Sequence, residues 1–167
     1  MNGVNLAIIA LGSNVGDSQS ILLQAMERLE GLSSRRLLKS SLWQTTPVDC
    51  PPGSPRFINA VVGLVPRAGE TPESLLVQLE EIEREFGRKP KNILNEPRPL
   101  DLDLIAWGNE IRSTPALTLP HPRAHLRRFV LQPLSEIAPH LVLPGQTKTV
   151  AELLDRLPPG ETVIRLS

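Results

Sequence analysis

Residues 98–105 read Arg98-Pro99-Leu100-Asp101-Leu102-Asp103-Leu104-Ile105, and this alternation of leucines with aspartates predicts a β-strand with one buried face. Both aspartates would leave the other face together, with Cα atoms roughly 7 Å apart at a rise of ~3.3 Å per residue. Two carboxylates so spaced can bind one Mg²⁺ or share two ions ~3.5–4 Å apart. Arg98 adds a planar cation suited to phosphate oxygens. The segment indicates a metal-assisted phosphoryl-transfer site, although Asp-x-Asp alone more often marks a solvated strand face.

Length and composition restrict the class of protein. The 167 residues predict one domain over 1–167. Lys plus Arg total 18 and Asp plus Glu total 18, so the basic excess expected of a nucleic-acid-binding protein is absent. No apolar run approaches the ~18 residues that span a bilayer, so we expect no membrane partner. Cys50 is the only cysteine, which excludes an intrachain disulfide and fits a cytoplasmic protein. We also expect a monomer.

The hydrophobic pattern predicts an α+β fold with a ferredoxin-like β-α-β-β-α-β core and an antiparallel sheet. The apolar run 6–11 predicts the first strand, followed by the Gly12-Ser13-Asn14 turn and a helix from Ser18. Strands are expected at 36–45 and 57–65. Thr71 and Pro72 open a second helix that ends at Gly87. The strand with the two aspartates follows, and additional C-terminal helices are expected at 130–138 and 150–157.

Basic residues cluster on both sides of the aspartate strand. Residues 87–98 and 121–128 hold 7 of the 18 Lys and Arg residues, although exposed loops often carry such residues without a function. In a neutral protein this clustering suggests a highly charged anion such as a polyphosphate. His121 and His125 are four residues apart, but Pro120 and Pro122 disfavour a helix there and no third ligand has zinc-site spacing. His121 is better interpreted as a phosphate or ribose donor. Neither G-x-x-x-x-G-K-[ST] nor G-x-G-x-x-G occurs.

Six segments, in this order, match a known enzyme family. They are Ala10-Leu11-Gly12-Ser13-Asn14-Val15-Gly16-Asp17, Phe57-Ile58-Asn59-Ala60, Pro97-Arg98-Pro99-Leu100-Asp101-Leu102-Asp103-Leu104, Pro120-His121-Pro122-Arg123, Arg127-Arg128-Phe129-Val130-Leu131 and Pro133-Leu134-Ser135-Glu136-Ile137-Ala138-Pro139. Over nearly its full length the chain resembles the 6-hydroxymethyl-7,8-dihydropterin pyrophosphokinases of folate biosynthesis. These enzymes transfer the β,γ-diphosphate of ATP to the hydroxymethyl oxygen of the reduced pterin and release AMP.

The resemblance implies roles for particular residues. Asp101 and Asp103 would bind two Mg²⁺ ions, one bridging the α- and β-phosphates of ATP and the other the β- and γ-phosphates and the attacking hydroxyl. The implied contacts with ATP, of which the two loop arginines also count as catalytic, are made by Arg88, Arg98, Thr118, His121 and Arg127. The substrates implied are ATP and 6-hydroxymethyl-7,8-dihydropterin.

The pterin pocket implied by the resemblance is formed by Thr45, Val48, Phe57, Asn59 and Phe129. A flat heterocycle stacks on aromatic faces, and an amide offers the donor and the acceptor that its pyrimidinone edge needs. A phenylalanine in an apolar run is, without the resemblance, more often a core residue. Asn95 replaces a tryptophan that often closes the loop over the pterin in the family.

Two other classes of protein remain open from the residues alone. Nucleotidyl transferases and cyclases also place two aspartates on ferredoxin-like sheets, and they release pyrophosphate rather than AMP. A protein that binds nucleotide or pterin without catalysis would keep the same pocket. Product identity separates these alternatives.

Overall fold

The computed structural model describes residues 5–46, 56–87, 99–160 and 162–166. The main sheet has the strand order β5-β1-β4-β3-β8, with β2 also paired to β4, and a second, two-stranded sheet pairs β6 with β7. The strands of the main sheet are β1 (Ala7–Ser13), β2 (Leu38–Lys39), β3 (Trp43–Thr46), β4 (Phe57–Leu64), β5 (Asp101–Trp107) and β8 (Thr162–Arg165). The remaining elements are β6 (Arg112–Ser113), β7 (Thr118–Leu119), the helices α1 (Ser18–Glu30), α2 (Pro72–Glu85), α3 (Arg128–Ile137) and α4 (Val150–Asp155), and a short 3₁₀ turn η1 (Ala124–Leu126).

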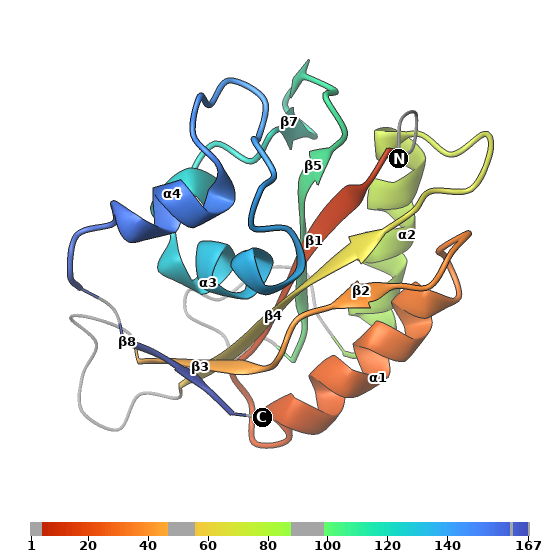
Figure 1. Ribbon diagram of the computed structural model, residues 1–167. Helices are drawn as coiled ribbons and strands as arrows, with labels where there is room; N and C mark the ends of the chain where they lie inside the picture. The colour runs from red at the N-terminus through yellow and green to blue at the C-terminus, as the bar shows by residue number, and fades with distance from the viewer. Residues whose placement is uncertain (1–4, 47–55, 88–98, 161, 167) are drawn as a thin grey trace.

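The predicted ferredoxin-like core is confirmed. Its strands β1, β2 with β3, β4 and β5 follow the β-α-β-β-α-β order along the chain, and every neighbouring pair is antiparallel. Helices α1 and α2 cover one face of the sheet, while α3 and α4 lie on the other (Figure 1). Two hydrophobic clusters therefore form, one on each face.

The start of α2 follows the sequence prediction closely. The Thr71 hydroxyl accepts a hydrogen bond from the Ser74 amide (3.1 Å), and the Ser74 hydroxyl accepts one from the Thr71 amide (2.8 Å). Pro72 occupies the first turn, where no amide hydrogen is needed. Gly87 follows the helix with φ of 91°, a conformation that favours glycine. Leu75, Leu79 and Ile82 make the buried stripe.

The prediction of one continuous strand at 36–45 is wrong, because the strand is interrupted between β2 and β3. The Ser40 hydroxyl, rather than a backbone carbonyl, accepts from the Val61 amide at 2.9 Å. The next residue, Ser41, donates from its amide and its hydroxyl to Glu136 of α3. These side-chain bonds compete with the regular ladder and divide the segment into β2 and β3.

The ends of the sheet also differ from the sequence prediction. Strand β1 continues beyond Leu11 to Ser13, so Gly12 is a strand residue. Helix α4 ends at Asp155, and β8 follows it and pairs with β3. The short β6 and β7 were not predicted.

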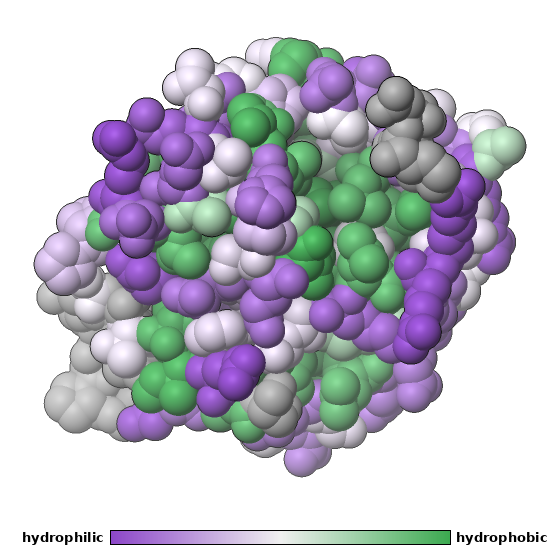
Figure 2. All heavy atoms as spheres, viewed as in Figure 1, coloured by the Kyte–Doolittle hydropathy of each residue, from purple (hydrophilic) through white to green (hydrophobic). Residues whose placement is uncertain are grey.

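Apolar side chains gather on the face beside α3 and α4, over β1 and β4 (Figure 2). Within the described ranges, no helix has the length and apolarity needed to cross a membrane.

Candidate active site

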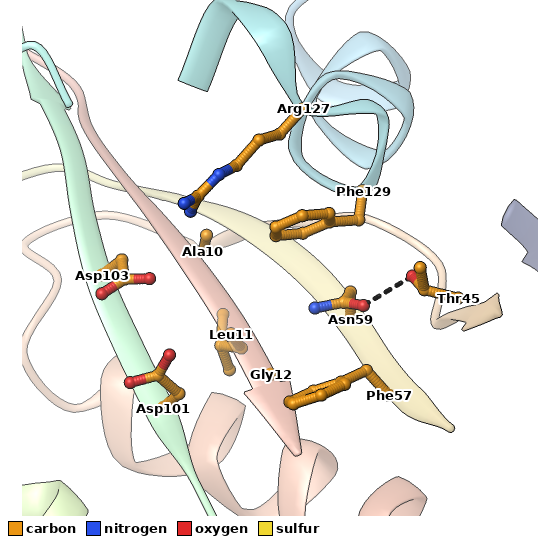
Figure 3. Close-up of a pocket in the computed structure, with 10 residues that line it drawn as sticks. All are labelled: Ala10, Leu11, Gly12, Thr45, Phe57, Asn59, Asp101, Asp103, Arg127 and Phe129. Atoms are coloured by element: carbon orange, nitrogen blue, oxygen red, sulfur yellow. Dashed lines mark hydrogen bonds between the residues drawn. The ribbon is translucent and has the colours of Figure 1, made fainter. Parts of the chain in front are cut away.

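Asp101 and Asp103 lie on one face of β5 and point into a pocket, as the alternation predicts (Figure 3). Leu102 and Leu104 are 5% and 4% exposed and pack in the cluster beneath α1 and α2. A β-bulge follows, because Ile8 pairs with Ala106 while Ile9 pairs with Leu104. The bulge comes after the aspartates and leaves their two-residue spacing regular.

The pocket has a volume of about 250 Å³ and lies on the α3 side of the sheet. It is lined by Ala10, Leu11, Gly12, Thr45, Phe57, Asn59, Asp101, Asp103, Arg127 and Phe129. These residues come from four strands and from the beginning of α3. The structure therefore brings together seven of the residues that the sequence analysis selected.

Strand register explains how the polar residues converge. Gly12 on β1 pairs with Asp101 of β5 on one side and with Asn59 of β4 on the other. Residues at one register position share a face of the sheet, so a carboxylate, an open position and an amide form one row. A Cβ atom at Gly12 would lie 3.1 Å from the Asn59 amide nitrogen. Gly12 thus keeps the floor of the pocket open between the carboxylates and the amide.

Thr45 and Asn59 form the polar wall of the pocket. Their side chains are buried, and the Thr45 hydroxyl donates to the Asn59 amide oxygen at 2.7 Å. The Asn59 amide nitrogen points away from Thr45 into the pocket (Figure 3). A buried amide needs partners, and here one of its two ends is bonded by protein while the other faces the space for a ligand.

Two aromatic rings flank this wall. Phe57 and Phe129 are half-buried and both line the pocket (Figure 3). Phe129 also packs against the cluster under α3 and α4, so it contributes to the core as well as to the pocket. The guanidinium carbon of Arg127 lies 5.4 Å from the centre of the Phe129 ring, within the range of a cation–π interaction. This contact holds a positive charge beside the two carboxylates.

His121 lies outside the pocket lining but close to its charged side. Burial lowers the pKa of His121 below its ordinary value, and the positive charges of Arg127 and Arg123 lower it further, against an opposing effect of Asp101. The imidazole is therefore neutral at pH 7. Its Nδ1 atom accepts from the Arg123 amide at 3.2 Å, which leaves the hydrogen on Nε2 as a donor. The backbone amide of His121 donates to the Ile105 carbonyl of β5 (2.8 Å).

The other predicted site residues are not in this pocket. Thr118 is exposed on β7, where it pairs with Ser113. Arg88, Arg98 and Val48 lie outside the described residues, as does Asn95.

The donor set fits magnesium bound together with a phosphate ligand. In the described part of the chain, no group of three or more His, Cys, Asp or Glu residues is placed to hold a metal ion. Two partly exposed carboxylates on one strand face remain, Asp101 and Asp103. Mg²⁺ is commonly bound by one or two carboxylates, with substrate phosphates and water supplying the other oxygens.

Two contributions were missed by the sequence analysis. Gly12 forms the pocket floor, and a glycine directly after an apolar run is a signal for such close approach. Glu83 of α2 accepts a hydrogen bond from the Leu102 amide, between the two aspartates. In the sequence, the position of Glu83 on the apolar side of α2, next to Leu79 and Ile82, could have indicated this buried role.

Two aspartates on one strand face beside an aromatic pocket supply the groups that metal-assisted phosphoryl-transfer enzymes use. The model of the 7,8-dihydro-6-hydroxymethylpterin-pyrophosphokinase family, HPPK, matches residues 8–139. The chain therefore belongs to this family, and the fold and function that the sequence resemblance implies are confirmed.

Individual relatives agree with this assignment. The chain is 39% identical to 2-amino-4-hydroxy-6-hydroxymethyldihydropteridine pyrophosphokinase of Haemophilus influenzae, over 89% of this chain and 90% of the relative. It is 37% identical to the protein of the same name from Synechocystis, over 90% and 75% of the two chains. Among solved structures, Plasmodium falciparum HPPK-DHPS with pteroate superimposes with a TM-score of 0.71 at 14% identity, over 93% of this chain. This chain spans 43% of that longer protein, and the likeness shows the fold alone.

Proposed function

We propose that the pocket binds the reduced pterin and that Asp101 and Asp103 bind two Mg²⁺ ions on the triphosphate of ATP. The family defines the reaction as an ATP-dependent pyrophosphokinase step of folate biosynthesis, in which diphosphate passes to 6-hydroxymethyl-7,8-dihydropterin. The observation that carries the site assignment is the juxtaposition, in one pocket, of two carboxylates with an amide and two aromatic rings.

The transfer requires the attacking oxygen, the β-phosphorus and the leaving oxygen to lie in line. The pterin hydroxymethyl oxygen attacks the β-phosphorus of ATP and gives up its proton to solvent. A new oxygen–phosphorus bond forms, and the bond from the β-phosphorus to the oxygen that joins it to the α-phosphate breaks, so AMP leaves with that oxygen. Bound magnesium would neutralise phosphate charge and lower the pKa of the attacking hydroxyl. Asp101 and Asp103 lie on the side of the pocket where this chemistry would occur, and Asn59 lies opposite them.

The remaining residues would orient the two substrates. Phe57 and Phe129 stack on the pterin, and Thr45 fixes the amide of Asn59 against its polar edge. Arg127 and neutral His121 donate to phosphate oxygens from the same side as the aspartates. Further roles follow from the family resemblance: Arg88 and Arg98 contact the triphosphate, Thr118 holds the nucleotide, and Val48 contacts the pterin.

The same proposal includes a monomeric, cytoplasmic enzyme. Among the described residues, both carboxylates and both rings of the pocket come from one chain, which supports a monomer. The single cysteine is consistent with a reducing compartment.

Product analysis tests the proposal directly. Purified protein is incubated with Mg²⁺, ATP and 6-hydroxymethyl-7,8-dihydropterin, and AMP is resolved from ADP and pyrophosphate. Equal amounts of AMP and pterin diphosphate are expected. ADP would mean γ-phosphoryl transfer, pyrophosphate would favour a nucleotidyl transferase, and absence of turnover would favour a binding protein.

The aspartates are tested separately with Asp101→Asn and Asp103→Asn. These variants keep the shape of the side chain and remove its charge, so each should lose most turnover while pterin binding and the unfolding transition stay close to wild type. Near-normal turnover in either variant would contradict the two-metal assignment.

A further inference from the structure

Strand β5 is the last strand on its side of the main sheet, so among the described residues no strand is hydrogen-bonded to the outer edge of its backbone. Asp101 and Asp103 pair with Gly12 and Ala10 of β1. The residue between them, Leu102, is 5% exposed. A buried amide on an open edge needs an acceptor from elsewhere in the protein.

Glu83 of α2 provides this acceptor. Its Oε2 atom accepts from the Leu102 amide at 2.8 Å. Glu83 is 8% exposed, whereas Glu80 and Glu81 on the same helix are exposed. Glutamate is almost never buried to this extent without a specific partner. The bond to the Leu102 amide is one such partner for the buried Glu83 carboxylate.

A second hydrogen bond to the backbone of β5 holds the same strand further along the chain. The Ile105 carbonyl accepts from the His121 amide at 2.8 Å. The bonds at Leu102 and Ile105 lie on either side of Asp103 in the chain. Both come from segments outside the sheet, so the position of the aspartate strand depends on α2 and on the His121 segment, as well as on β1.

We infer that Glu83 is a positioning residue for the diphosphate transfer: its bond to Leu102 holds the strand so that both aspartates face the pocket at the spacing that the metal ions require. This inference rests on the proposed function, because it assigns Mg²⁺ to Asp101 and Asp103. Glu83 comes from α2, which covers the face of the sheet opposite α3, and it is not among the residues that line the pocket. Residues that orient metal ligands typically change metal affinity by about 10–100-fold when replaced.

Two substitutions of Glu83 separate the effect of side-chain length from the effect of its charge. Glu83→Asp keeps the carboxylate but shortens the side chain by one methylene, so the bond to Leu102 is lost. Glu83→Gln keeps the length and an acceptor oxygen but removes the charge. Glu81→Gln, an exposed change on the same helix, is the matched control.

Mg²⁺ is titrated by calorimetry into each full-length protein in the presence of α,β-methylene-ATP and without pterin, and pterin affinity is measured separately. We expect Glu83→Asp to weaken Mg²⁺ binding about tenfold or more, while Glu83→Gln and the control remain within about threefold of wild type. Pterin affinity should change little in all three. Amide hydrogen exchange of Leu102 in metal-free protein should accelerate in Glu83→Asp and stay near the wild-type rate in Glu83→Gln.

Three results would overturn the inference: wild-type Mg²⁺ affinity in Glu83→Asp, a larger loss in Glu83→Gln than in Glu83→Asp, or a parallel loss of pterin affinity that indicates general damage. If Glu83→Asp does not fold, Glu83→Gln alone tests the inference. In that variant, slow exchange of the Leu102 amide would show that the bond is intact. A tenfold loss of Mg²⁺ affinity despite that bond would contradict the positioning role of Glu83. Failure of the proposed function is distinguishable, because Asp103→Asn would then bind Mg²⁺ as well as wild type does.

Discussion

The hydrogen bond between Thr45 and Asn59 offers the sharpest quantitative test of the pocket. Thr45→Val removes the hydroxyl and keeps the shape, which leaves the Asn59 amide oxygen buried without its 2.7 Å donor. A buried acceptor left in this way costs about 1–3 kcal/mol. Asn59 borders a pocket, where water can reach part of the amide, so we expect the lower part of this range, about 1–2 kcal/mol of unfolding free energy.

The same change should weaken pterin binding, because the amide is no longer held in one orientation toward the ligand. A loss of the same size in binding free energy would lower the affinity for the pterin about 5–30-fold, while the affinity for MgATP should be unchanged. Urea unfolding and calorimetric titration with each ligand measure the two effects. Thr45→Ser, which retains the hydroxyl, should stay close to wild type in both. Thr45→Val with unchanged stability and unchanged pterin affinity would refute the reasoning.

Gly12→Ala should weaken pterin binding with little effect on MgATP in parallel titrations, since the new Cβ would lie 3.1 Å from the Asn59 amide nitrogen and 4.0 Å from the Phe57 ring; unchanged pterin affinity would show that the amide moves freely. Arg88→Ala, which follows from the family resemblance, should lower kcat more than it weakens ATP binding in single-turnover and binding measurements; an unchanged kcat would exclude a role in the chemical step. The lowered pKa of His121 means that the unfolded chain binds a proton more readily than the folded protein between the ordinary value of 6.5 and the lowered value. Unfolding free energy, measured by urea at several pH values, should therefore fall as the pH drops through this window, and His121→Gln should show a smaller fall; equal falls would assign the acid sensitivity to other groups.

Local patterns in the sequence were sufficient to predict the core elements. The alternation around Asp101 and Asp103 placed both carboxylates on one strand face, because side-chain direction in a strand reverses at every residue. Thr71, Pro72 and Gly87 marked the ends of α2 for equally local reasons. The order of these elements, together with the family motifs, led to the ferredoxin-like fold and to the family itself.

The errors arose where partners distant in the chain determine the backbone. The interruption between β2 and β3 depends on Ser40 bonding to Val61 and on Ser41 bonding to Glu136, and such side-chain bonds leave no periodic signal. Strand β8 is short, and it is a strand because β3 offers it an edge. Neither feature could be predicted from neighbouring residues alone.

The sequence by itself determined which chemical groups the protein carries and which faces of its strands they occupy, since both follow from residue type and from a period of two. Only the tertiary structure decided that Gly12 separates Asp101 from Asn59, because strand register is set by pairing across the sheet. It also decided that Glu83 meets the backbone of the aspartate strand, because that contact depends on how α2 packs against β5.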